Sequence, residues 1–349
     1  MDAYINLLKS LISVSSLSRN EQEAAHIIRG FFTESRIKFD SKENNTWVKN
    51  RFWKDGLPVI LLNSHIDTVR PASGYTRDPF SPDVENGILY GLGSNDAGGP
   101  LVTLLAVFMY FYTTENLPFN LIYAASAEEE ISGTNGLASI LDELGPIDLA
   151  IVGEPTKMQM AIAEKGLMVL DCTAHGKSGH AAREEGENAI YKAIADIEKI
   201  RNYRFEKTSD ILGPVKMSVT VINAGTQHNV VPDLCSFVVD VRTNEFYSNQ
   251  QACAIISELI ESDVAPRSFR LNSSGIPVEH PIVQLGISLG LSYYGSPTTS
   301  DQAVIPYPSI KIGPGDSARS HTANEYILIS ELEEGFRIYV DLLTDLIIS

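Results

Sequence analysis

Several short apolar segments of this chain end in a histidine or an acidic residue, and this pattern constrains the fold more than any other feature. The segment 58–62 is followed by His65 and Asp67, and the segment 121–126 is followed by three glutamates at 128–130. Short apolar runs bounded by glycine or proline are typical of buried strands in a parallel sheet. We therefore predict an α/β domain whose strands deliver polar side chains at one edge.

Two further runs and a glycine-rich loop extend the pattern. The run 149–152 precedes Glu154, the run 309–312 leads to His321, and Asp96 lies in the glycine-rich stretch 91–99 before an apolar helix. Open α/β sheets place their active sites at the carboxyl ends of the strands. The pattern therefore predicts one strand-end cluster, which consists of His65, Asp67, Asp96, Glu129, Glu130, Glu154 and His321.

This cluster carries negative charge that needs compensation. Five carboxylates in one cleft repel one another, and most would be protonated unless cations neutralise them. Two divalent cations would supply the missing charge. A ligand set of nitrogen and oxygen without sulfur suits Zn²⁺, with Co²⁺ or Mn²⁺ as substitutes. A pair of metals about 3.5–4 Å apart can activate a water and polarise a carbonyl together.

Each of these residues also has an ordinary structural explanation. His65 could be a hydrogen-bonded core histidine, and the triple glutamate could be a solvated helix start, where acids favour the dipole. Asp96 could cap a helix, and Glu154 and His321 could be plain loop residues. These explanations leave open why all of them follow strand-like segments.

Length and composition exclude several classes of protein. A chain of 349 residues is long for one core, so two domains are expected, and the net charge of −17 argues against nucleic-acid binding. The apolar stretch 101–112 is too short to span a bilayer, and we expect a core helix there and no signal peptide. Three scattered cysteines, Cys172, Cys235 and Cys253, predict buried thiols in a reducing, cytoplasmic compartment.

The order of predicted elements indicates an inserted domain. Two amphipathic helices in 2–35, with Ser18 and Glu21 as a capping box, and an edge strand at 45–48 precede the His65 strand. After residue 165 we predict a β-α-β-β-α-β order of the ferredoxin-like type. Its strands and helices are expected at 168–174, 188–201, 215–222, 236–241, 248–263 and 268–272. The catalytic domain would then comprise 1–165 and 275–349, and the inserted α+β domain would comprise 166–274.

Six phrases of the sequence carry a resemblance to a known family. They lie, in chain order, at 64–69, 90–96, 127–130, 152–156, 176–180 and 229–232. On these phrases the chain resembles the dinuclear zinc aminoacylase and carboxypeptidase family. That family includes acetylornithine deacetylase, succinyl-diaminopimelate desuccinylase and carboxypeptidase G. Of these three, acetylornithine deacetylase has the most similar sequence pattern. The resemblance implies a mixed-sheet zinc-exopeptidase-like catalytic domain.

The resemblance implies metal ligands at five positions. His65 and Glu154 would hold one zinc, Glu130 and His321 would hold the other, and Asp96 would bridge them.

The resemblance also implies two catalytic roles in the cluster. Asp67 would orient His65, and Glu129 would act as the general base. Within the triple glutamate, we assign the base to Glu129 and the ligand to Glu130 because of their spacing from Gly136 along the chain. This spacing is more similar to that of the desuccinylase than the spacing of a shifted assignment would be.

The inserted domain resembles the lid and dimerisation domain of the family, which implies a homodimer. His180 would help to stabilise the tetrahedral oxyanion. Asn229, Arg242 and Thr299 would bind substrate, since a guanidinium donates two parallel hydrogen bonds to an α-carboxylate.

A succinyl group would need a further cation, for which Lys165 and Arg319 are the candidates. Both residues flank the predicted site in the sequence.

These features predict a two-zinc amide hydrolase that removes an acyl group from the α-nitrogen of a small amino acid. The main hypothesis is N-acetyl- or N-succinyl-ornithine or citrulline in arginine biosynthesis. The alternative is a succinyl-diaminopimelate desuccinylase or a small-peptide exopeptidase. A dinucleotide-binding oxidoreductase is disfavoured for two reasons. The stretch 91–99 lacks the GxGxxG spacing, and the negative charge of Asp96 would face a negatively charged pyrophosphate. An inactive metal-binding scaffold is disfavoured because Glu129, beside a full set of metal ligands, would have no structural role in such a scaffold.

Overall fold

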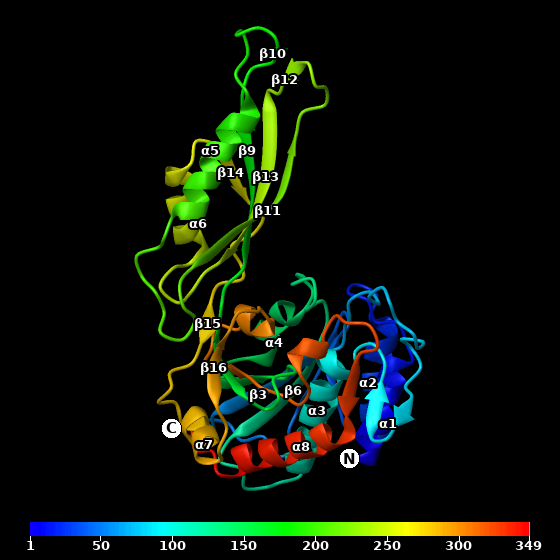
Figure 1. Ribbon diagram of the computed structural model, residues 1–349. Coiled ribbons are helices and arrows are strands. Elements are labelled where there is room, and N and C mark those ends of the chain that lie inside the picture. Colours follow the sequence, from blue (N-terminus) through cyan, green and yellow to red (C-terminus); the bar gives the residue numbers. More distant parts are fainter. Residues whose placement is uncertain (349) are drawn as a thin grey trace. The chain divides into compact units, whose positions relative to one another are not determined.

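The computed structural model describes residues 1–348 and divides into two compact units (Figure 1). The first unit comprises Met1–Ile162, Gly275–Tyr294 and the described chain from Ser300 onward, and the second comprises Ala163–Ser274 and Gly295–Thr299. The segment 295–299, expected in the catalytic domain, therefore groups with the inserted unit. The reason is local, because the main-chain nitrogen of Lys165 donates to the carbonyl of Ser296 at 3.1 Å.

Four parallel strands form the centre of the first unit. They are β3 (Val59–His65), β6 (Asn120–Ser126), β7 (Leu149–Val152) and β17 (Ser309–Lys311), in the sheet order β6-β3-β7-β17. Every residue of these strands is buried, which explains their continuous apolar character. Since parallel strands end at the same edge, the loops after all four lie at one side of the sheet.

Antiparallel strands extend this sheet and make it mixed. β1 (Asp40–Lys42) pairs with β2 (Asn45–Lys49), β2 pairs with β6, and β8 (Met160–Glu164) pairs with β17. The α/β mixed-sheet prediction is confirmed. The strand predicted at 45–48 is confirmed as β2, but its predicted edge position was wrong, because β1 covers the outer side of β2 and β6 lies between β2 and β3.

Helices cover the sheet and share its apolar core (Figure 1). They are α1 (Asp2–Ile12), α2 (Gln22–Glu34), α3 (Gly99–Phe111), α7 (Pro281–Ser288) and α8 (Ile329–Thr344). The short α4 (Leu141–Leu144) belongs to a second cluster around Trp47 and Leu61. α3 is buried along most of its length, as the apolar stretch there predicted. Among residues 1–348, no helix combines the length and the apolar character that crossing a bilayer requires.

The predicted capping box of α2 was wrong. Glu21 is the N-cap residue and makes no side-chain cap bond. Its carboxylate accepts the main-chain N–H of Arg19 at 2.6 Å instead. The Ser18 hydroxyl donates to the carboxylate of Asp67 at 2.7 Å, so this serine serves the cluster rather than the helix.

A small three-stranded sheet lies beside the main one in the first unit. It has the order β18-β5-β4, formed by β4 (Val84–Glu85), β5 (Ile88–Tyr90) and β18 (Tyr326–Leu328). It joins the segment before Asp96 to the segment after His321.

The second unit is an antiparallel sheet with two helices. Its strands β9 (Met168–His175), β11 (Lys216–Ala224), β13 (Leu234–Arg242) and β14 (Asp263–Pro266) have the order β11-β13-β9-β14, and its helices are α5 (Ala189–Asn202) and α6 (Asn249–Leu259). This is the predicted β-α-β-β-α-β succession. Cys172, Cys235 and Cys253 are free thiols in its core.

The last strand of this unit does not lie at 268–272 as predicted. Because α6 already ends at Leu259, the chain reaches the sheet early, and Val264 pairs with Cys172. It then turns away, where the Ser268 hydroxyl accepts the N–H of Arg270 at 3.1 Å. The short strands β15 (Ser274–Gly275) and β16 (Tyr293–Ser296) follow.

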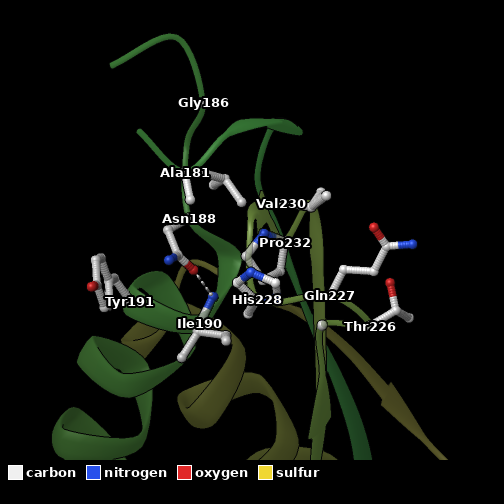
Figure 2. Close-up of a pocket in the computed structure, with 12 residues that line it drawn as sticks. Ala181, Gly186, Asn188, Ile190, Tyr191, Thr226, Gln227, His228, Val230 and Pro232 are labelled. Carbon is white, nitrogen blue, oxygen red and sulfur yellow. Dashed lines mark hydrogen bonds between the residues drawn. The ribbon is translucent and has the colours of Figure 1, made fainter. Parts of the chain in front are cut away.

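Two further short strands, β10 (Gly179–His180) and β12 (Val230–Val231), pair with each other in the second unit. Beside them is a hollow of about 690 Å³ (Figure 2). Asn188, His228 and Pro232 are among the residues that line it.

A buried carboxylate joins α5 to the segment between α6 and β14 in the second unit. Asp196 on α5 is 2% exposed. Its carboxylate accepts the main-chain N–H of Ser262 at 2.8 Å, the hydroxyl of Ser262 at 2.7 Å and the N–H of Glu261 at 3.1 Å. Burial raises the pKa of Asp196, but the hydrogen bonds from Ser262 and Glu261 outweigh burial and lower it.

We predict that Asp196→Asn lowers the free energy of unfolding by about 1–3 kcal/mol at neutral pH, because buried donors lose a charged acceptor. A carboxyl with a lowered folded-state pKa stabilises above its unfolded pKa and loses that contribution as pH falls. The difference between wild type and variant should therefore shrink below about pH 4. Denaturant unfolding at pH 7 and at pH 3 measures both; an unchanged difference at pH 3 would contradict the linkage.

Candidate metal centre

His65 is the last residue of β3 and is 2% exposed. Its Nδ1 lies 2.8 Å from the main-chain carbonyl of Asp67, so Nδ1 carries the proton and Nε2 is available to the cluster. Nε2 lies 3.4 Å from Oδ1 of Asp96 and 3.8 Å from a carboxylate oxygen of both Glu129 and Glu154. This strand end therefore aims one imidazole nitrogen at three carboxylates.

Asp96 lies between the two imidazoles. Its Oδ1 faces His65, and its Oδ2 lies 3.7 Å from Nε2 of His321. The side chain comes from the turn Ser94–Gly98 before α3, and the peptide bond from Asp96 to Ala97 is cis. One carboxylate oxygen for each histidine is the arrangement that a bridging ligand requires.

The three glutamates after β6 point in different directions. Glu128 has a left-handed backbone, with φ of 55°, and its carboxylate accepts from the side-chain nitrogen of Asn135 at 3.0 Å. Glu130 lies 3.0 Å from Nε2 of His321, and Glu129 lies near His65. The structure thus brings Glu129 and Glu130, and not Glu128, into the cluster.

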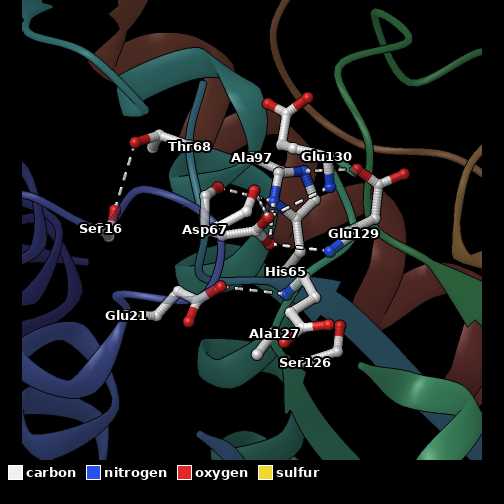
Figure 3. A network of polar contacts seen from close by, with 12 residues as sticks. Ser16, Glu21, His65, Asp67, Thr68, Ala97, Ser126, Ala127, Glu129 and Glu130 are labelled. Atoms are coloured by element: carbon white, nitrogen blue, oxygen red, sulfur yellow. Dashed lines mark hydrogen bonds and ion pairs between the residues drawn. The ribbon is translucent and has the colours of Figure 1, made fainter. Parts of the chain in front are cut away.

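Asp67 organises this turn (Figure 3). Its carboxylate accepts the N–H groups of Glu129 at 3.0 Å and Glu130 at 3.1 Å. Its Oδ1 lies 3.5 Å from Nδ1 of His65, farther than its own carbonyl does. The nearest contact of Asp67 with His65 is therefore through its main-chain carbonyl, with its carboxylate farther away.

The pKa values of the cluster residues indicate whether the site suits cations. Burial, and then the charge of Asp96, raises the pKa of Glu154 to about 8. Burial also raises the pKa of Glu129 well above its usual range, with Glu154 adding to the effect. The hydrogen bond that His321 donates to Glu130 raises the pKa of His321 to about 9. Without cations these groups retain protons, which is the behaviour of a site that lacks positive charge.

The donor set also fits divalent cations. Two groups, His65 with Asp96 and Glu130, and His65 with Glu129 and Glu154, each bring their ligand atoms within 4.8 Å of one another. Nitrogen and carboxylate oxygen without thiolate suit Zn²⁺, Co²⁺ or Mn²⁺. Glu129 therefore has the geometry of a ligand as well as that of a base.

Two buried acids near the cluster were not predicted from the sequence. Glu325 accepts the N–H groups of Asn95 and Asp96, each at 2.9 Å, and burial followed by the charge of Asp96 raises its pKa to about 8. Asp301 accepts the hydroxyl of Ser126 at 2.6 Å, and burial raises its pKa. Glu325 lies in a loop and Asp301 begins the short 3₁₀ helix Asp301–Val304, and in neither place does a periodic pattern separate a buried acid from a solvated one.

The predicted substrate contacts fall into separate groups. In the second unit, Asn229 accepts the main-chain N–H of Ala181 at 3.0 Å, which brings it beside the exposed His180. Arg242 donates to Asp240 at 2.8 Å and, at 3.3 Å, to the hydroxyl of Thr299.

Lys165 and Arg319, the proposed cations for a succinyl group, differ in their surroundings. Nζ of Lys165 donates to the carbonyl of Pro214 at 2.6 Å, and its own carbonyl accepts from Thr299. Arg319 in the first unit binds the carboxylate of Glu331 at 2.7 and 3.0 Å. That pairing neutralises the guanidinium of Arg319 and assigns it a structural role, so the structure gives its predicted substrate contact no support.

The fold and the cluster together are those expected of an α/β metallohydrolase with an inserted α+β unit. Comparison with known proteins gives the same class. Residues 61–345 match the sequence profile of peptidase family M20/M25/M40. The chain belongs to this family.

Individual relatives extend the comparison. A succinyl-diaminopimelate desuccinylase from Wolbachia pipientis subsp. Culex pipiens is 26% identical over 96% of this chain and 91% of its own. The crystal structure of aminopeptidase PepT from Bacillus cereus superposes with a TM-score of 0.79 at 19% identity, covering 98% of this chain and 97% of that one. The Bacillus subtilis YXEP protein, described as a dinuclear metal-binding M20 peptidase, gives 0.75 at 17% identity over 98% and 97%.

These findings confirm the family and bear on the choice within it. Desuccinylases recur among the relatives, including one from Psychromonas ingrahamii. They do not support the specific similarity to acetylornithine deacetylase or the place in arginine biosynthesis, and they favour the stated alternative.

We predict that cation binding releases protons. At pH 7 the metal-free protein holds protons on Glu154, with a pKa of about 8, and on His321, with a pKa of about 9. Because ligands bind metal deprotonated, and because His65 and Glu129 also have raised pKa values, at least two protons should leave per chain at pH 7, and affinity should rise with pH up to about 9. Titration calorimetry with Zn²⁺ in buffers of different ionisation enthalpy measures the release. Affinity independent of pH would contradict this charge assignment.

Proposed function

We propose that this chain hydrolyses the amide bond of an N-acyl amino acid whose acyl group carries a carboxylate, with N-succinyl-diaminopimelate as the leading substrate. The observation that carries the proposal is the strand-end cluster. Two imidazoles face the two oxygens of Asp96, with Glu154 beside one of them and Glu130 beside the other. Family membership makes the chain a metal-dependent amidohydrolase.

The cluster residues divide into holding and proton-transfer roles. His65 and Glu154 would hold one cation, Glu130 and His321 the other, and Asp96 both. When bound, two divalent cations supply Lewis acidity, which lowers the pKa of a water and polarises an amide carbonyl. We propose Zn²⁺ because the donor set suits it.

Glu129 is the proposed general base. Its carboxylate lies 3.8 Å from His65 and its turn is fixed by the carboxylate of Asp67. A carboxylate in this position takes a proton from the attacking water and delivers it to the leaving amine. Burial raises its pKa, which favours a group that both accepts and returns a proton.

A cationic group in the second unit supports a substrate with more than one carboxylate. Lys216 pairs with Arg242 across strands β11 and β13. Burial lowers the pKa of Lys165, and the charges of Lys216 and Arg242 lower it further, so the three cations are close. Asp240 offsets the charge of Arg242, which it binds at 2.8 Å, so Lys165 and Lys216 supply the positive charge that is suited to an anion. A succinyl amino acid offers both an α-carboxylate and the carboxylate of its acyl group.

Three further predictions accompany this proposal. Dimerisation through the second unit, stabilisation of an oxyanion by His180 and a cytoplasmic location remain predictions.

We predict that Glu129→Gln lowers turnover by about 100- to 10,000-fold, the range for loss of a general base, while two cations stay bound. Metal analysis after dialysis, beside initial rates, separates base from ligand, since loss of one cation would show that Glu129 is a ligand. Glu128→Gln is the matched control, because that carboxylate faces Asn135, and its turnover should stay within about tenfold of wild type.

A substrate panel tests the acyl group. Zn²⁺-loaded protein should hydrolyse N-succinyl-diaminopimelate faster than N-acetylornithine, N-succinylornithine, the two citrulline derivatives or a dipeptide, and chelator should abolish the rate. Lys216→Met should raise KM for the succinyl substrate about tenfold, or about 1.4 kcal/mol, and leave N-acetylornithine nearly unchanged. Lys192→Met, on exposed α5 surface, is the matched control. Preference for the dipeptide would instead indicate an exopeptidase.

A further inference from the structure

Two loops that carry cluster residues bind each other through side chains outside the cluster. The first loop, 91–98, carries Asp96, and the second, 313–325, carries His321. Asn95 reaches from the first loop to the second, and Glu325 reaches from the second to the first. The contacts are therefore reciprocal.

Glu325 holds the backbone of the first loop. Its side chain is almost fully buried, at 1% exposure, and one carboxylate oxygen accepts the N–H groups of Asn95 and Asp96 at 2.9 Å each. Its own carbonyl accepts the N–H of Gly91 at 3.0 Å, next to the pairing of β18 with β5. Glu325 is thus anchored by a sheet and fixes both ends of the turn that leads to Asp96.

Asn95 holds the second loop in return. Its side-chain oxygen accepts the N–H of Asp316 at 3.0 Å. Its side-chain nitrogen donates to the carbonyl of Asp316 at 3.1 Å and to the hydroxyl of Ser320 at 3.3 Å. Ser320 directly precedes His321, so the contact ends at the imidazole-bearing residue.

We propose that Glu325 is a positioning residue that sets the separation between Asp96 and His321, and so the affinity of the cation site that these residues share with Glu130. The separation it controls is the 3.7 Å between Oδ2 of Asp96 and Nε2 of His321. A carboxyl group suits this task because one of its oxygens accepts both N–H groups at once. The inference rests on the proposed metal-dependent function.

A leucine at position 325 keeps the approximate size of the side chain but removes the oxygen that accepts these N–H groups. Groups behind metal ligands typically change metal affinity by 10- to 100-fold when they are replaced. Glu325→Leu should therefore keep one tightly bound cation and weaken the other roughly 10- to 100-fold. Glu325→Gln, which retains an acceptor oxygen, should recover part of that loss.

The experiment is a titration of the full chain with Co²⁺ and with Zn²⁺, followed by metal stoichiometry and by the visible absorption of the Co²⁺ form. Thermal unfolding of each variant accompanies it. Asp196→Asn is the matched control, because Asp196 is also a buried carboxylate that accepts main-chain N–H groups, but in the second unit. It should lose stability and keep both cations with an unchanged Co²⁺ spectrum.

The outcomes separate this inference from the proposed function. A wild-type chain that binds no cation would overturn both. Wild type binding two cations, with Glu325→Leu binding both at equal affinity and with the same spectrum, would overturn only the role of Glu325. Loss of a cation in Asp196→Asn to the same extent would also overturn it, because general destabilisation would then explain the effect. If Glu325→Leu does not fold, the same comparison is made with Glu325→Asp, whose shorter side chain draws the acceptor oxygen back.

Discussion

The carboxylate of Asp67 joins three segments of the first unit, and the arrangement of the cluster depends on it. It accepts the hydroxyl of Ser18 and the main-chain N–H groups of Glu129 and Glu130, while its carbonyl faces His65. Burial alone would raise the pKa of Asp67, but these partners, His65 first, keep it low. An ionised group at this position therefore holds the loop after β6 against the end of β3. Without it, the N–H groups of Glu129 and Glu130 would lose the acceptor that they share.

Much of the site could be predicted from the sequence because parallel strands end at one edge of a sheet. Residues far apart in the chain, such as His65 and Glu154, follow β3 and β7, and those strands are hydrogen-bonded neighbours. Strand-like segments and the residues after them were therefore sufficient to assemble the cluster. Order within the sheet was not accessible in the same way. The insertion of β6 between β2 and β3 joins non-local segments, and no local pattern encodes that choice.

The features that the sequence did not reveal share a physical cause. Glu325 is an acid in a loop and Asp301 begins a short 3₁₀ helix, and tertiary contacts bury both. Ser18 has the pattern of a helix cap, but Asp67 competes for its hydroxyl. Nothing in the sequence indicates a partner for Arg319, but in the structure this residue forms an ion pair with Glu331. Side-chain partners of this kind are set by the fold as a whole, which also explains why the family was easier to infer than the substrate.

The position of β17 in the sheet has a consequence for the order in which the protein becomes competent. The strand pairs with β7 although well over a hundred residues separate them, and the entire second unit lies between them in the chain. During synthesis, the ligands that follow β3, β6 and β7 emerge long before His321 does. The cluster is therefore incomplete until nearly the whole chain has been made. Cation binding then reports that the last part of the first unit has joined the rest, and a growing chain carries only an acid-rich, partial site.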